Sequence, residues 1–149
     1  MTLNEIYTLV EEKRNLSIEQ MLKECNADIV RDNDLMRGFE ARSMIIDDVF
    51  VIFLQEGLPD IRENYLILHE LGHFYCDTSK ERDANLFVCL YLINNQIWED
   101  CYFQEYLVCN GADRKVADQV NDAIYSYKMD IQSQIGWRIC HQKSALFNI

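Results

Sequence analysis

The sequence contains His69-Glu70-Leu71-Gly72-His73, in which two histidines lie four positions apart and a glutamate follows the first. In an α-helix, positions i and i+4 share one face and lie about one turn apart. Two imidazoles so placed can bind one zinc ion, each at about 2.0–2.1 Å. The side chain of Glu70 projects from the next position of the helix, from which it can reach a water molecule bound to the ion. The motif therefore predicts a zinc site with His69 and His73 as ligands and Glu70 as the catalytic base.

A catalytic zinc site takes a third protein ligand and keeps one position open for water. If the turn at Asp77 joins two antiparallel helices, residues equally far from it face each other, which places Glu81 opposite His73. The same pairing places Asn85 opposite His69. The helix after the turn is apolar almost all round, so a Glu and an Asn on it need polar partners. We expect Glu81 to be the third ligand and Asn85 to accept a hydrogen bond from an imidazole N–H.

Other interpretations of these residues are open at this point. Residues 78–81 also form a T-x-x-E capping box, in which Glu81 would bond to the backbone N–H of Thr78. Asp83 and Cys76 are alternative third ligands. Asp83 lies roughly 200° round the helix from Glu81, and a cysteine in this position is more often part of a core.

The elements that must position these residues are helical after Pro59 and mostly β-like between residues 27 and 54. The expected helices are 3–13, 18–24 with Ser17 as N-cap, 60–76, 79–94, 96–109 and 113–130. The expected strands are 27–31 at an edge and a hairpin of 38–46 with 49–54. We predict an α+β fold, in which a small antiparallel sheet packs on a mostly helical, zincin-like domain with H-E-x-x-H on a central helix.

The chain is predicted to be a single domain over residues 1–149. Its parts are N-terminal helices in 1–25, the sheet in 27–54, a metal-binding helix pair in 60–94 and C-terminal helices in 96–149. Ile61, Tyr65 and the two histidines recur every four residues, so the face that carries them is expected to point toward the core. Gly111 is expected to cap the helix before it. His141, in the last segment, is expected to be a surface or core histidine.

The chain has 149 residues, 14 basic and 25 acidic, which gives a formal net charge of −11 at pH 7. Such a surface repels phosphate backbones, so we expect no direct nucleic-acid partner. It attracts a basic protein and raises the rate of encounter with it.

No apolar run approaches the ~20 residues that cross a bilayer, and the N-terminal residues lack the apolar segment of a signal peptide, so we expect a cytoplasmic protein without membrane association. The six cysteines form no C-x-x-C pair and are expected to be small buried apolar residues.

Three further segments extend the pattern around H-E-x-x-H. Residues 65–68, Y-L-I-L, lead into it; residues 81–87, E-R-D-A-N-L-F, follow it; residues 36–39, M-R-G-F, and the strand 49–54 precede it. With these segments, residues 20–95 resemble the ImmA/IrrE family of metallopeptidases. The resemblance implies that His69, His73 and Glu81 hold zinc and that Glu70 is the catalytic base.

The resemblance also implies a function. Members of this family typically cleave or antagonise a helix-turn-helix repressor, which switches on the genes of a prophage or mobile element. A repressor presents a basic DNA-binding face, to which a chain of net charge −11 is attracted. Two alternatives belong to other classes of protein. One is a non-catalytic antirepressor or toxin–antitoxin component with a structural zinc site, and the other is a structural α+β domain without metal.

Overall fold

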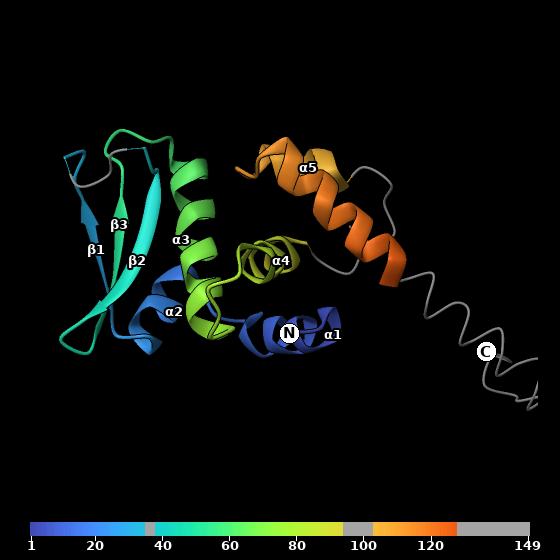
Figure 1. Cartoon of the computed structure of the whole chain (residues 1–149), viewed down its shortest axis with the longest axis horizontal. Coiled ribbons are helices and arrows are strands. Elements are labelled where there is room, and N and C mark those ends of the chain that lie inside the picture. The colour runs from blue at the N-terminus through green and yellow to red at the C-terminus, as the bar shows by residue number, and fades with distance from the viewer. Residues whose placement is uncertain (35–37, 94–102, 128–149) are drawn as a thin grey trace, which may run out of the picture.

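A three-stranded sheet with helices on one of its faces makes up the part of the chain that the computed structural model describes, residues 1–34, 38–93 and 103–127 (Figure 1). The strands are β1 (Ala27–Arg31), β2 (Ala41–Ile46) and β3 (Val49–Leu54), in the spatial order β1-β3-β2. The chain reverses between β2 and β3 at Asp47 and Asp48, which both have positive φ, as a two-residue hairpin of the tight kind requires. The predicted hairpin is confirmed, with its first strand beginning at Ala41.

The prediction of an antiparallel sheet is wrong for one of its two strand pairs. β2 and β3 are antiparallel, but β1 and β3 are parallel, so the sheet is mixed. The three strands alternate in direction along the chain, and β3 enters the sheet between the first two strands. Because β1 and β3 are the first and third strands along the chain, they run in the same direction, and they are neighbours in the sheet. Both β1 and β2 are therefore edge strands.

The helices are α1 (Leu3–Lys13), α2 (Ile18–Glu24), α3 (Asp60–Tyr75), α4 (Glu81–Leu92), α5 (Phe103–Cys109) and a last helix over residues 114–127. α1 and α2 have the predicted bounds, and both begin with capping boxes, at Thr2 and at the predicted Ser17. α4 begins two residues later than predicted. Two parts of the predicted helices, residues 96–102 and 128–130, lie outside the described residues. His141, which was predicted to be a surface or core residue, lies outside them as well.

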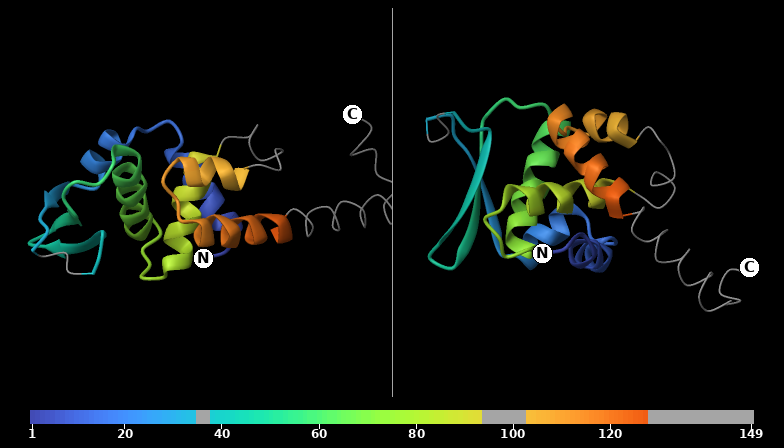
Figure 2. Two further views of the ribbon diagram at one scale, coloured as in Figure 1. Left: turned by 90° about the horizontal axis from the view of Figure 1, so that it is seen from above. Right: turned by 45° about the vertical axis from the view of Figure 1, so that its right-hand side comes forward.

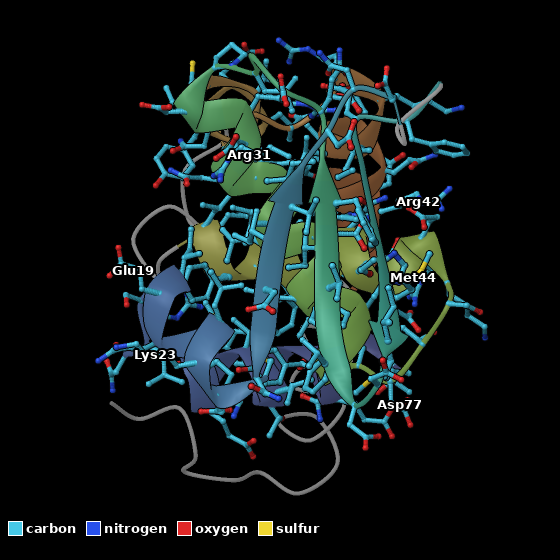
Figure 3. All side chains as sticks on the ribbon, turned by 90° about the vertical axis from the view of Figure 1, so that its left-hand side faces the viewer. Glu19, Lys23, Arg31, Arg42, Met44 and Asp77 are labelled. Atoms are coloured by element: carbon cyan, nitrogen blue, oxygen red, sulfur yellow. The ribbon has the colours of Figure 1, made fainter. Side chains whose placement is uncertain are left out.

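The helices form successive layers behind the sheet (Figures 1 and 2). α3 lies against the inner face of the sheet, where Phe50, Ile52 and Leu54 of β3 are buried. α4 crosses behind α3, with α1 on one side of it and the pair of α5 and helix 114–127 on the other. The H-E-x-x-H helix is thus the layer between the sheet and the remaining helices. The outer face of the sheet is covered by no described helix (Figure 3).

α3 and α4 pack closely because a glycine lies where they cross. A Cβ atom on Gly72 would lie 3.0 Å from the backbone oxygen of Ala84 and 3.1 Å from the Cβ of Phe87. Neither α4 atom is the far end of a flexible side chain. The absence of a side chain at Gly72 therefore sets the separation of the two helices that carry the candidate zinc ligands.

The apolar stripe on α3 differs from the prediction at its first member. Tyr65 is buried, but Ile61, in the first turn of the helix, is 55% exposed. Gly111 caps the turn after α5 as predicted, with φ of +105°. No described helix is both long and apolar enough to cross a membrane.

The cysteines follow the prediction in part. Cys25, Cys76 and Cys89 are free and buried. Cys109, at the end of α5, is also free but exposed, so the expectation of a core residue is wrong there. Cys101 and Cys140 lie outside the described residues.

Candidate metal centre

The side chains of His69 and His73 stand one above the other on α3, with ring centroids 4.9 Å apart. Glu81, the first residue of α4, faces both of them across the turn. One of its carboxylate oxygens lies 2.9 Å from Nε2 of His69, and the other lies 3.0 Å from Nε2 of His73. The structure therefore brings together the two predicted histidines and the predicted carboxylate.

These three residues fit the donor set of a zinc ion. One ligand atom from each lies within 4.8 Å of the other two, and no other group of three such side chains converges elsewhere in the described ranges. The imidazoles are largely shielded, with side chains 12% and 16% exposed, whereas Glu81 is 72% exposed. Two shielded nitrogens and one carboxylate with an open side leave room for water or substrate.

The loop after α3 orients His73 from behind. Asp77 has φ of +46°, which turns the chain back on the helix end, and the Thr78 N–H bonds to the His73 carbonyl at 3.2 Å. The Thr78 carbonyl lies 2.9 Å from Nδ1 of His73. When Nδ1 carries the proton and donates it to this carbonyl, Nε2 has its lone pair free for a metal. Sequence reasoning missed this partner, because a backbone carbonyl leaves no residue-type signature.

The capping-box interpretation of Glu81 is excluded by the start of α4. The N-cap residue is Lys80, which makes no side-chain cap hydrogen bond, and the Thr78 hydroxyl accepts a hydrogen bond from the Lys80 N–H instead. The Glu81 carboxylate points away from the backbone of Thr78 and toward the imidazoles.

The alternative third ligands lie elsewhere. The Asp83 side chain is 2% exposed and pairs with the amino group of Met1 at 3.5 Å and with Arg82. Cys76 is buried near Asp83, and burial raises the pKa of its thiol to about 11. Neither Asp83 nor Cys76 belongs to the group of converging ligand atoms formed by His69, His73 and Glu81.

Glu70 is held by a residue that sequence reasoning missed. Its side chain is buried, and one carboxylate oxygen accepts a hydrogen bond from the hydroxyl of Ser43 on β2. Ser43 reaches Glu70 only because the register of the hairpin turns it toward α3. A serine in a strand gives no hint of such a contact before the register is known.

The site opens into a cavity of about 940 Å³ between β2, α3, the loop after it and α4. Its walls include both histidines, Glu70, Glu81 and Asn85. Within the described residues Asn85 has no hydrogen bond to either imidazole, and the role predicted for it stays a prediction.

The surroundings of His69 favour its metal-binding protonation state. Burial lowers the pKa of His69 because it disfavours the imidazolium, and the nearby carboxylates of Glu70 and Glu81 oppose this only in part. The neutral imidazole is the form that binds a metal. At the far end of the cavity the Arg62 guanidinium holds the pKa of the Glu40 carboxyl below its usual value.

Comparison of the chain with protein-family models, curated proteins and solved structures gave no match.

Proposed function

We propose that this chain is a zinc-dependent endopeptidase. One observation carries the proposal: ligand atoms of His69, His73 and Glu81 converge within 4.8 Å at the wall of a large cavity, and Glu70 lies in the same wall. A zinc ion held there would polarise the scissile carbonyl and lower the pKa of a coordinated water. A helical H-E-x-x-H with a third carboxylate ligand is the pattern of a metal-dependent peptide hydrolase with a zincin-like fold.

Glu70 would move the proton in this reaction. Its carboxylate takes the proton of the attacking water and delivers it to the amine that leaves. The hydroxyl of Ser43 fixes one of its oxygens and so orients the other. The shielded imidazoles and the contact with β2 keep these groups in place before a substrate arrives.

A peptide substrate suits the edge strand beside the site. β2 pairs with β3 on one side, and its other side borders the cavity. An extended peptide can bind a free strand edge by backbone hydrogen bonds. We propose a basic helix-turn-helix repressor as the substrate, which the net charge of −11 and the resemblance of residues 20–95 to the ImmA/IrrE family support.

Replacement of Glu70 by Gln tests the catalytic assignment. The zinc-loaded variant should keep its metal and cleave 10²–10⁴-fold more slowly, the range that a general base contributes. The assay is mass spectrometry of a helix-turn-helix repressor, with unfolded casein beside it as a sequence-independent probe. Full activity in the variant would contradict the role of Glu70. Intact probes after incubation with the wild type, with repressor bound, would favour the non-catalytic antirepressor.

A further inference from the structure

The inner face of β2 carries both a polar and an apolar residue toward the cavity. Side chains alternate along a strand, so Ser43 and Ile45 share one face, while Arg42 and Met44 belong to the other (Figure 3). Ser43 bonds to Glu70. Ile45 lines the same cavity, and yet it is 68% exposed. A large aliphatic side chain is thus exposed on the same face of β2 as Ser43, the residue that bonds to Glu70.

Two aromatic rings complete an apolar notch around this residue. Phe50 lies opposite Ile45 in the register of the hairpin and is 5% exposed, so it forms the floor. The ring of Phe74 lies 4.9 Å from that of Phe50, and Phe74 is 37% exposed. All three residues line the cavity. We call these three residues the Ile45 notch.

The two ends of the cavity differ in chemistry. The far end carries the ion pair of Arg62 with Glu40, whose atoms lie 2.9 Å apart. The notch has only carbon atoms in its three side chains, and Phe74 directly follows the ligand His73. Exposed apolar side chains gathered in a cavity beside polar groups are typical of ligand sites.

We infer that the Ile45 notch is a specificity subsite that binds a bulky apolar side chain of a substrate residue within two positions of the scissile bond. The inference rests on the proposed function. Ile45 lies two residues from Ser43, which is about 7 Å along the strand. A peptide extended beside β2 has the same spacing, so a side chain in the notch belongs to a residue within two positions of the bond near Glu70.

The subsite can be measured without catalysis by using two zinc-binding peptide hydroxamates. They share one sequence and differ only in the two residues nearest the hydroxamate, which are both Leu in one compound and both Ala in the other. Calorimetry on the zinc-loaded full chain should show the Leu compound binding about tenfold more tightly, because the notch covers part of the extra carbon atoms. The preference should disappear in Ile45→Lys and fall in Ile45→Ala. It should persist in Ile61→Lys, a matched control at an exposed isoleucine outside the cavity.

The outcomes separate the subsite from the proposed function. Equal binding of both compounds to the wild type, or a preference that survives in both Ile45 variants, would overturn the subsite while supporting the metal site. Failure of both compounds to bind the zinc-treated protein would overturn the subsite together with the metal centre on which it depends.

Discussion

Two residues of the candidate centre, His73 and Glu70, are held by contacts outside it. His73 meets the Thr78 carbonyl through Nδ1, and Glu70 meets the Ser43 hydroxyl. Glu81 is less restrained, because its carboxylate is 72% exposed and meets only the two imidazoles. The two carboxylate oxygens of Glu81 lie 2.9 and 3.0 Å from the Nε2 atoms of His69 and His73, so the groups that would share an ion are already close together. The arrangement of His69, His73 and Glu81 in the structure is thus close to the one that a bound zinc ion would require.

Ser43→Ala should slow peptide cleavage by about tenfold while the zinc content stays that of the wild type. Loss of one hydrogen bond to a charged group costs on the order of 1.5–3 kcal/mol, and here part of that cost falls on the orientation of Glu70. The measurement is kcat beside metal analysis of the same sample. Ser43→Thr keeps the hydroxyl and should recover most of the rate. A Ser43→Ala enzyme as fast as the wild type would show that Ser43 does not position Glu70.

At the scale of elements, the site is a product of two helices that cross at Gly72. α3 carries two of the candidate ligands and the proposed base, and α4 carries the third candidate ligand as its first residue. The backbone of α4 at Ala84 lies against Gly72. A small change in the separation of the helices would move Glu81 relative to both imidazoles.

Gly72→Ala tests this dependence. Alanine favours a helix over glycine by about 1 kcal/mol, but its Cβ would press on backbone atoms of α4 that cannot rotate away. We expect overpacking to dominate, with a net loss of about 1–2 kcal/mol in the free energy of unfolding and weaker zinc binding. Urea unfolding and zinc titration measure the two effects. An alanine variant that is more stable and binds zinc equally well would contradict the account of this crossing.

The bounds of helices and strands were easier to predict from the sequence than the contacts between them. The helices α1 and α2 were predictable to the residue because Thr2 and Ser17 cap them locally. The spacing around the turn at Asp77 also predicted Glu81 opposite His73, and in the structure Glu81 lies near both histidines. The parallel pairing of β1 was not predictable, because the order of strands depends on which gap β3 fills. Ser43 escaped notice for the same reason, since its partner depends on the register of the sheet.

At the scale of the whole molecule, the net charge of −11 predicts how a basic substrate would associate. Raising the salt concentration from 0.05 to 0.5 M should lower the association rate constant with a basic repressor about tenfold or more, because salt screens long-range attraction. The Glu70→Gln variant keeps the bound repressor intact during a surface plasmon resonance measurement. The dissociation rate should change much less. An association rate that is independent of salt would contradict steering by charge.

Metal content is the most direct test of the central claim. Protein purified without chelator is analysed by mass spectrometry as wild type, His73→Ala, Glu81→Gln and Glu19→Gln, the last being an exposed glutamate in the first turn of α2. We predict about one zinc per chain in the wild type and in Glu19→Gln, and loss of zinc in the other two. No zinc in the wild type after zinc is added back would contradict the metal centre, and zinc retained in Glu81→Gln would remove Glu81 from it.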